Sequence, residues 1–436
     1  MKKLIAFLSF IALTVLLVSC MASGDMIAPD DLFESNYVPS TKAPDSGKQT
    51  EAPSATDGGT PPQTEPPVKD EKKVIKFVGV GDALIHSAIY WEAETIASSM
   101  TGYNKKYYFK DMYEHIADRI AGADIAFVNH ESPIANTGIS GYPNFNSPEE
   151  SGDALVELGF NVINIANNHM FDSDGRTTGY ADTIDYWATK DVLQIGGYKN
   201  KEDYDKPRIM SIDGVDIAFL AYTYSTNGNN MNAASVSAGY VTPIYNDATL
   251  IKHIKTAKEQ ADLVFVSMHW DWSSENQIPT TSEQRRLAKL IADQGADVII
   301  GHHSHTVQPV EWITGATGKK TLCIYSLGNL ISGMLYPQTT VGGMMTFDIV
   351  KDKDGIRIEN PIYNPTVCHF EIADFNVKAA DGYPKRTGFK VYMLEDYSQT
   401  LAAKHGVRYY GALSYDIMKG YPKNNISAEF LPDFLK

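Results

Sequence analysis

From Val74 onward, short apolar runs alternate with amphipathic segments along the chain. The apolar runs are typical of buried β-strands: VIKFVGV (74–80), IAFV (125–128), VINIA (162–166), IAFLAY (217–222), LVFVSM (263–268) and VII (298–300). The segments between them repeat apolar positions at helical spacing: 109–120, 151–158, 179–189, 248–260 and 281–294. This alternation predicts an α/β domain built around a central, largely buried sheet.

The helical periodicity fades after Lys320. Three further runs then look like strands and are candidates for a second sheet: 321–327, 344–350 and 356–363. Past residue 400 the pattern is harder to interpret, but Tyr409, Tyr410 and Tyr415 indicate packing rather than a free tail. We therefore expect a folded domain over 73–365 and a C-terminal extension packed on it over 366–436.

The first twenty residues carry an export pattern. Lys2 and Lys3 precede an apolar stretch that is too short for a confident membrane span, and Leu17-Val18-Ser19-Cys20 resembles a bacterial lipobox. This predicts a signal peptide over 1–20, a lipidated Cys20 and a protein tethered to the outer face of the cell membrane. An ordinary signal peptide or an uncleaved anchor are the alternatives.

A linker is expected between Cys20 and the folded domain, over 21–72. Residues 38–67 contain seven prolines and no aromatic residue, so they cannot bury enough apolar surface to order themselves. Such a segment is typical of a flexible tether that spaces a domain from a membrane.

Composition narrows the function classes. The chain has 436 residues, 43% of them hydrophobic, which is a globular composition. It carries 38 Lys and Arg against 53 Asp and Glu, a formal charge of −15, and this balance argues against nucleic acid as a partner. Any anionic ligand must then meet a local cationic feature such as a metal. Three cysteines are too few for a disulfide framework.

Polar clusters follow five of the predicted strands. Ligands of α/β proteins bind at the carboxyl ends of strands, so we expect one edge of the sheet to receive these residues: Asp82, His86, His130, Glu131, Asn168, His169, Asp172, His269, His302, His303 and His305. Imidazole, carboxylate and amide groups without a thiolate suit a hydrolytic metal site, often with two metals. In an extended segment, His303 and His305 would point to the same side.

Several of these residues also have a plain structural interpretation. Asp82 could cap a helix or form a turn, and His86 could be a packed histidine at a helix start. Asn167 and Asn168 could make turn hydrogen bonds, and His269 could be a satisfied core histidine. His130 and His302 are expected to support the ligands rather than bind metal directly.

The clusters, in this order, resemble the bacterial capsule synthesis (poly-γ-glutamate biosynthesis, CapA-like) family, which is related to the calcineurin-like metallophosphoesterases. The matching segments lie between about residues 74 and 335: GDALIH (81–86), NHESPI (129–134), ANNHMFD (166–172), SMHWDW (267–272), QGADVIIGHHSHTVQPVE (294–311) and YSLGNLI (325–331). The resemblance implies a four-layer α/β/β/α sandwich with a metal site between loops at one end of the paired sheets.

The resemblance also implies roles for individual residues. Asp82 would ligate a first metal, Glu131 would take the bridging position, and Asn168 and His269 would ligate a second metal. His303 and His305 would complete the site, one on each metal. His169 would protonate the leaving group or stabilise the transition state, oriented by Asp172. The D-x-H of the first phosphoesterase motif is Asp82-Ala83-Leu84 here, so His86 is the candidate to replace the missing histidine.

These assignments lead to three hypotheses for function. The first is a hydrolase with two divalent metals (Mn, Fe or Zn), acting on a phosphoester or on an amide of poly-γ-glutamate or peptidoglycan. Tyr222, Tyr224 and Trp270 could shape a polymer groove, although core packing explains the tyrosines equally well. The second is a non-catalytic accessory protein that binds or guides an anionic cell-surface polymer or its precursor, beside membrane-bound capsule synthesis machinery. The third is a solute-binding lipoprotein, which leaves the histidine-rich strand ends unexplained.

Overall fold

The computed structural model describes residues 72–436 except 136–137, 174–178 and 379–380. These residues belong to one compact unit, Val68–Lys436. The expected signal peptide, Cys20 and the linker up to residue 71 lie outside the described residues. Within the described ranges, none of the helices is both long enough and apolar enough to cross a membrane.

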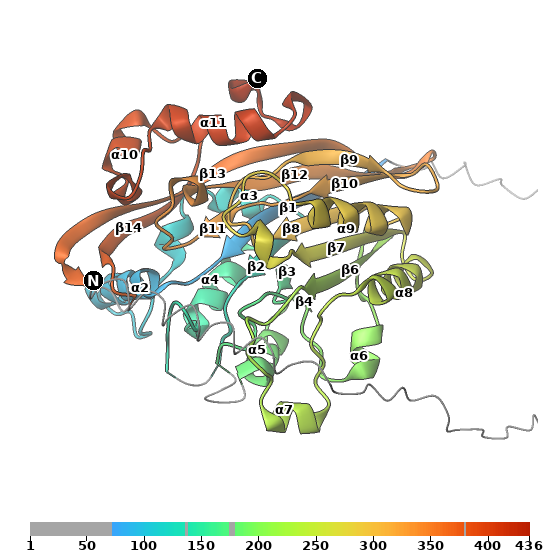
Figure 1. Ribbon diagram of the computed structural model, residues 1–436, viewed down its shortest axis with the longest axis horizontal. Coiled ribbons are helices and arrows are strands. Elements are labelled where there is room, and N and C mark those ends of the chain that lie inside the picture. Colours follow the sequence, from blue (N-terminus) through green and yellow to red (C-terminus); the bar gives the residue numbers. More distant parts are fainter. Residues whose placement is uncertain (1–71, 136–137, 174–178, 379–380) are drawn as a thin grey trace, which may run out of the picture. The chain divides into compact units, whose positions relative to one another are not determined.

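The first sheet has eight strands, in the order β14-β13-β12-β1-β2-β3-β4, with β11 paired to β1 (Figure 1). Strands β1 to β4 are parallel, and β12 to β14 extend the sheet in antiparallel fashion beyond β1. Their bounds are β1 Lys73–Ala83, β2 Ile125–His130, β3 Val162–Asn164, β4 Leu193–Ile195, β11 Asn329–Ile331, β12 Val341–Asp352, β13 Gly355–Lys378 and β14 Pro384–Met393.

The second sheet has six strands, in the order β5-β6-β7-β8-β10-β9. Strands β6, β7, β8 and β10 are parallel, and β5 and β9 are antiparallel edges. Their bounds are β5 Arg208–Ile212, β6 Val215–Thr223, β7 Leu263–His269, β8 Val298–His302, β9 Val310–Thr314 and β10 Lys320–Ile324.

The two sheets pack face to face and helices cover their outer faces. Phe77 of β1 and Phe347 of β12 contact Phe265 of β7, with ring centroids 5.7 and 5.9 Å apart, so one apolar core lies between the sheets. Helices α8 (Asp247–Lys258) and α9 (Ser282–Asp293) bury Leu250 and Leu287 in a separate core on the outer face of the second sheet.

Helices on the other side complete the layers. Helix α2 packs against β14 and α5 against β4. The fold is thus the expected α/β/β/α sandwich. The remaining helices are α2 Ser87–Ser99, α3 Ala117–Ala121, α4 Glu149–Leu158, α5 Gly179–Ala188, α6 Lys201–Asp205, α7 Ala233–Ala238, α10 Gln399–Lys404 and α11 Tyr415–Asn425.

Two expectations about the sheets were wrong. The six early apolar runs do not share one central sheet, because three of them become β1, β2 and β3 and the other three become β6, β7 and β8. The later runs do not form a sheet of their own: β10 joins the second sheet, and β12 and β13 join the first. A strand buried on both faces is apolar throughout, so its sequence does not say which sheet it enters.

Two other segments also differ from the expectation. The helix expected over 109–120 is interrupted, since a short 3₁₀ turn at Lys110–Tyr113 precedes α3. The boundary expected between 365 and 366 falls inside β13, which runs unbroken from Gly355 to Lys378. The chain beyond 366 therefore contributes β14 to the first sheet, and the later 3₁₀ turns at Gly406–Tyr409 and Ala428–Phe430 pack against β13 (Figure 1).

Candidate metal centre

The five polar clusters converge at one end of the paired sheets, but they arrive from both sheets. Asp82 ends β1 and Glu131 directly follows β2 in the first sheet, while His269 ends β7 and His302 ends β8 in the second. Parallel strands of each sheet thus deliver their carboxyl ends to a shared site, rather than to one edge of a single sheet. All the candidate ligands are buried: Asp82, Glu131, Asn168, His269, His303 and His305.

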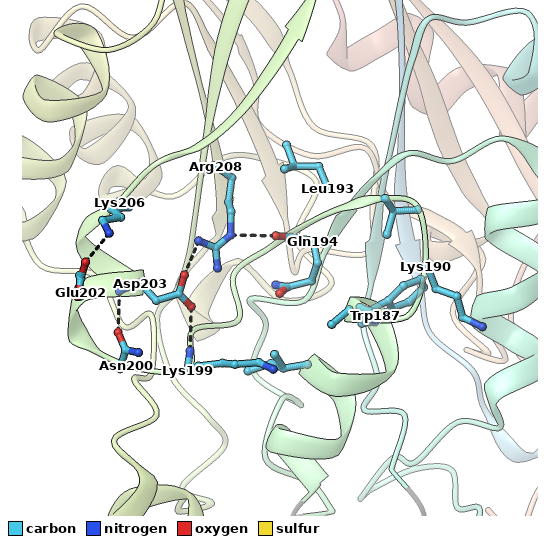
Figure 2. Close-up of a pocket in the computed structure, with 13 residues that line it drawn as sticks. Trp187, Lys190, Leu193, Gln194, Lys199, Asn200, Glu202, Asp203, Lys206 and Arg208 are labelled. Carbon is cyan, nitrogen blue, oxygen red and sulfur yellow. Dashed lines mark hydrogen bonds and ion pairs between the residues drawn. The ribbon is translucent and has the colours of Figure 1, made fainter.

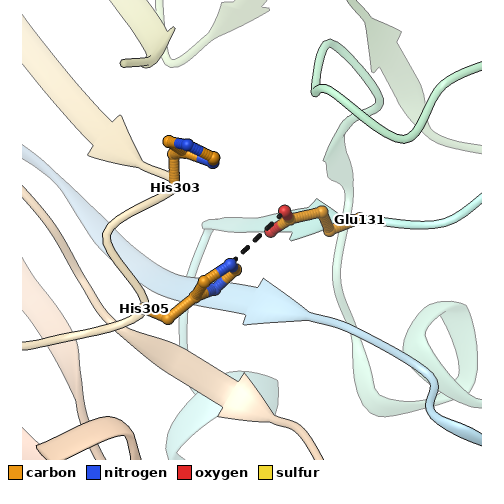
Figure 3. Close-up of side chains that lie close together, drawn as sticks. All are labelled: Glu131, His303 and His305. Atoms are coloured by element: carbon orange, nitrogen blue, oxygen red, sulfur yellow. Dashed lines mark ion pairs between the residues drawn. The ribbon is translucent and has the colours of Figure 1, made fainter. Parts of the chain in front are cut away.

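Three of these residues form a metal-sized cluster. Glu131, His303 and His305 each offer one ligand atom, and these atoms all lie within 4.8 Å of one another. Figure 3 shows the His303 and His305 rings near the Glu131 carboxylate. His305 Nε2 lies 3.8 Å from Glu131 Oε1. Carboxylate and imidazole are suitable ligands for Mn, Fe and Zn.

Asp82 connects this cluster to a buried hydrogen-bond network. His302 Nδ1 lies 2.9 Å from Asp82 Oδ1, and His305 Nδ1 lies 3.2 Å from Asp82 Oδ2. Asn129 donates from Nδ2 to both carboxylates, at 2.8 Å to Asp82 and 3.3 Å to Glu131. Burial acts to raise the pKa of Asp82, but the hydrogen bonds with His302 and His305 outweigh it and hold that pKa well below its usual range.

His269 and Asn168 extend the cluster on the other side of Glu131. His269 Nε2 lies 2.9 Å from Asn168 Oδ1 and 3.4 Å from Glu131 Oε1. The structure therefore brings Asn168, His269 and Glu131 to one point. Glu131 lies between this pair and the Asp82 side of the site.

Polar atoms without partners mark the middle of the site. Among the described residues, Glu131 Oε1 and both ring nitrogens of His303, which belong to the metal-sized cluster, are buried and have no hydrogen-bond partner. Leaving one such atom unsatisfied costs about 1–3 kcal/mol, so a group of them in one place calls for an occupant. A cation bound by carboxylate oxygens and neutral imidazoles fits this donor set.

The protonation states of His269 and His303 favour the same occupant. Burial, together with neighbouring histidines, holds the pKa values of His269 and His303 well below their usual range, so both rings are neutral and keep a lone pair for a metal. At His305, by contrast, burial is outweighed by the hydrogen bond and charge of Asp82, which raise the pKa of that ring. Burial and the nearby charge of Asp82 raise the pKa of Glu131. A divalent cation beside Glu131 would oppose that rise and keep the carboxylate ionised.

The backbone of the His303–His305 segment is not extended, contrary to our expectation. Both histidines have positive φ values, 86° at His303 and 55° at His305. Residues other than glycine seldom adopt this conformation, and when they do they often lie at functional sites. The two rings converge because the loop turns sharply here, not because of strand alternation.

His169 and Asp172 lie beside the cluster. His169 Nδ1 is 2.7 Å from Asp172 Oδ2, which also accepts a hydrogen bond from Phe145 N at 2.8 Å. Asn229 donates to the other oxygen of Asp172 at 3.0 Å. The carboxylate is thus held in place on both oxygens and fixes the orientation of the imidazole.

Two of the candidate histidines lie outside the cluster. His86 occupies the N-cap position of α2 without a side-chain cap bond, and its Nδ1 lies 3.1 Å from both Leu84 O and Gly333 N. His130 is directed away from Glu131: its Nδ1 donates to Ser132 O at 2.8 Å and its ring packs edge-on against Trp187. Burial lowers the pKa of His130 to about 4, as expected for a neutral core histidine.

The sequence analysis missed some residues that hold the ligands. Asn129 pairs with Asp82 in the β1–β2 register, and Asn329, at the start of β11, pairs with Asp82 from the other side. Asn329 Oδ1 lies 3.0 Å from His305 Nδ1 and so fixes that ring. Both asparagines belong to segments that carried the family resemblance, and their position at the end of an apolar run was the available signal.

The predicted aromatic groove was wrong for two of its three residues. Tyr222 and Trp270 are fully buried: the Tyr222 hydroxyl lies 3.0 Å from His253 Nδ1, and Trp270 Nε1 donates to Tyr325 O. Only Tyr224 lies at the site, with its ring centroid 4.8 Å from that of His303.

A pocket lies away from the candidate centre. It has a volume of about 600 Å³ and is lined by residues of α5, β4 and α6, with none of the candidate site residues (Figure 2). Its cations are already paired within the protein, as Arg208 is with Asp203 at 2.7 Å and Lys206 with Glu202. We assign it no part in the chemistry of the metal centre.

Comparison with known proteins identifies the family. The family of bacterial capsule synthesis proteins, PGA_cap, matches residues 76–334, which is more than half of the chain and includes every ligand of the candidate metal centre. The chain belongs to this family. The matched range ends before β12, so the family region contains the centre, the whole second sheet and five of the eight strands of the first sheet.

Two relatives carry related names. The chain is 32% identical over 215 residues to the PGA biosynthesis protein CapA of Bacillus subtilis, covering 49% of this chain and 53% of that protein. It is 28% identical over 248 residues to the capsule biosynthesis protein CapA of Bacillus anthracis, covering 55% and 57%. The chain thus matches little more than half the length of each relative.

Solved structures align with the chain only at low identity and low TM-score. A hypothetical protein from Thermus thermophilus aligns over 67% of this chain and 99% of its own length, at 14% identity and a TM-score of 0.37. The sulfate thiohydrolase SoxB of the same genus aligns over 57% of this chain and 40% of its own, at 12% identity and a TM-score of 0.35.

Proposed function

We propose that the chain is a metal-dependent hydrolase, exported and lipid-anchored, that processes a polymer of the bacterial cell surface or its precursor. The observation that carries the proposal is the buried convergence of Glu131, His303 and His305, with unpartnered ligand atoms, next to the His169–Asp172 pair. Membership of a capsule synthesis family supports the polymer as the substrate.

Two divalent metals, Mn, Fe or Zn, fit the donor set. Asp82 and His305 would hold one, and Asn168, His269 and His303 the other, with Glu131 between them. Metals in such a site polarise the scissile group and activate water. The protein's own part is to fix the ligands through Asn129 and Asn329 and to exclude bulk water by burying them.

His169 is the candidate general acid. With Nδ1 bonded to the Asp172 carboxylate, its other nitrogen, Nε2, is the one that can hold a proton for the leaving group. Asp172 fixes the orientation of the ring through this hydrogen bond. The bond broken would be a phosphoester or an amide, since either leaving group takes up one proton.

One observation favours the non-catalytic alternative. The position of the histidine in the D-x-H motif is occupied by Leu84, and Nδ1 of His86 is engaged with Gly333 N instead. A centre that lacks this group could hold metal and bind a polymer without hydrolysing it.

Metal content tests the centre. We expect the full-length chain, purified without chelator and reconstituted with Mn, Fe or Zn, to hold about two metals per chain, because ligands lie on both sides of Glu131. The His303→Ala/His305→Ala variant should lose them, whereas His115→Ala, at a partly exposed histidine outside the centre, should keep them. A native chain that takes up no metal would refute the hydrolase.

Turnover separates the enzyme from the accessory protein. With phosphoesters and γ-glutamyl amides as substrates, His169→Ala should lower the rate about 10²–10⁴-fold while the metal content stays unchanged. Absence of any metal-dependent rate in the native chain, despite full metal content, would leave the binding protein as the function.

For the anchor, Cys20→Ser should abolish lipidation, and unchanged membrane attachment of this variant would refute the lipobox.

A further inference from the structure

A second pocket, of about 340 Å³, opens next to the metal centre, and we call it the tyrosine groove. Four tyrosines with partly exposed rings line it: Tyr142 (61% exposed), Tyr336 (54%), Tyr383 (48%) and Tyr410 (40%). The volume is in the range of small-ligand sites. Large aromatic side chains seldom collect in the open on a soluble protein without a binding role.

The tyrosine groove is continuous with the candidate centre. Asn276, which lines the groove, donates its backbone N–H to Ser304 O at 2.9 Å, and Ser304 lies between the ligands His303 and His305. On another side, the Phe145 ring packs edge-on against both His86 of the groove and His169, at 5.1 and 4.7 Å. A chain lying in the groove would therefore have its neighbouring unit next to the metal centre.

The charges of the groove do not suit a polyanion. Asp381 and Arg386 neutralise one another in a buried ion pair. Glu275 then remains as a lining carboxylate for which no ion pair occurs among the described residues. Burial and the nearby Arg386 charge lower the pKa of His86 to about 3, so this ring adds no positive charge. A string of carboxylates, such as polyglutamate, would meet repulsion here.

The chemistry of the lining suits a sugar. A tyrosine presents an apolar ring face and a hydroxyl, which matches a sugar ring with its C–H face and surrounding hydroxyls. Asn276 Oδ1 and Arg386 Nε are buried at the groove without a hydrogen-bond partner among the described residues, one an acceptor and the other a donor. A hydroxyl can serve both kinds of group, whereas a carboxylate can only accept.

We propose that the tyrosine groove binds an uncharged sugar unit of a polymer whose scissile phosphoester or amide bond reaches the metal centre, so that the substrate is a sugar-containing polymer and not polyglutamate. The proposal that the groove binds sugar does not depend on hydrolase activity. The cleavage of the bound polymer rests on the proposed hydrolase function.

Binding of defined oligomers to the full-length chain tests this. The probes are oligomers of N-acetylglucosamine, maltooligosaccharides and oligo-γ-glutamate, measured by calorimetry in a detergent without a sugar head group. We expect a neutral oligosaccharide to bind and oligo-γ-glutamate not to bind. Tyr336→Ala and Tyr383→Ala should each weaken the sugar about five- to tenfold, as expected for loss of one stacked ring.

Matched variants exclude an effect on folding. Tyr409→Ala removes a more exposed ring that packs against Phe375 outside the groove and should leave affinity unchanged. Tyr383→Phe keeps the ring face and should keep most of the affinity. Glu275→Lys should leave the neutral sugar nearly unaffected. Oligo-γ-glutamate binding to the native chain, or sugar binding that none of the groove variants weakens, would overturn the proposal, as would no sugar binding at all.

The metal-free His303→Ala/His305→Ala variant separates the two proposals. Because the groove is built from other residues, this variant should still bind the sugar with native affinity. Sugar binding without turnover in the native chain would refute the hydrolase and keep the groove. Metal-dependent turnover of γ-glutamyl amides without sugar binding would support the hydrolase and refute the sugar-binding groove.

Discussion

Glu131 is a carboxylate placed where ionisation is unfavourable. Its side chain has no exposure to solvent, and its Oε1 has no hydrogen-bond partner among the described residues. Burial and the charge of Asp82 therefore raise its pKa above the ordinary value of 4.5. In the metal-free protein the folded state holds a proton that the unfolded state releases, so stability falls as pH rises above about 4.5.

Glu131→Gln should therefore stabilise the metal-free protein and weaken metal binding. At neutral pH we expect the free energy of unfolding to rise by about 1–3 kcal/mol, because a neutral amide replaces a buried carboxylate. The gain should shrink as the pH approaches 4.5, where the native carboxyl is protonated in both states. Denaturant titrations with chelator present, over a pH series, measure the difference in the free energy of unfolding between the variant and the native protein.

The exposed Glu429→Gln serves as the control and should change stability by less than about 0.5 kcal/mol. A Glu131→Gln protein that is less stable than the native one without metal at pH 7, or that retains full metal content, would contradict this account of the centre.

At the level of elements, close approaches between strands and loops set the positions of the ligands. A Cβ on Gly301, in β8, would lie 2.0 Å from Tyr325 O and 2.2 Å from Trp270 Nε1. The space is occupied by the hydrogen bond from Trp270 Nε1 to Tyr325 O, 2.7 Å long. Glycine thus lets β8 come close to the segment after β10, directly before the loop of His303 and His305.

Gly301→Ala should disturb the centre from within the fold. We expect it to destabilise the protein by about 1–3 kcal/mol, as overpacking does, and to lower metal content by moving the loop that carries His303 and His305. Thermal unfolding and metal analysis measure both effects. Gly138→Ala, where no atom of the described residues lies within 4 Å of the new Cβ, should leave both unchanged. Equal behaviour of the two variants would contradict the role given to Gly301.

The same elements show what the sequence could predict. Apolar runs ending in polar clusters revealed β1, β2, β3, β7 and β8, because the strands are buried on both faces and their ligands follow directly. The assignment of strands to two sheets depends on long-range pairing, such as β1 with β12, which local patterns do not encode. The sharp loop at His303 and His305 was missed because only glycine usually signals a positive φ.

At the scale of the whole molecule, the candidate centre depends on both sheets and the sheets depend on the C-terminal region. Asp82 and Glu131 come from the first sheet and His269 and His303 from the second, so separation of the sheets would dismantle the centre. Beyond β14, the side chains of Met418, Phe430 and Leu435 join the same apolar core as the first sheet. The segment past residue 394 is therefore expected to unfold together with the rest of the domain, in one transition.

Phe430→Ala tests this coupling. Phe430 is 1% exposed and belongs to the main core, so its loss should lower the free energy of unfolding of the whole domain by about 3–5 kcal/mol. Phe434→Ala, at a ring that is 37% exposed and outside that core, should have a clearly smaller effect. Fluorescence-detected unfolding, with metal release followed in parallel, distinguishes the cases. If Phe430→Ala shifted only a minor early transition while metal release kept its native midpoint, the C-terminal region would be an independent unit; a shared shift means that it helps hold the two halves of the metal centre together.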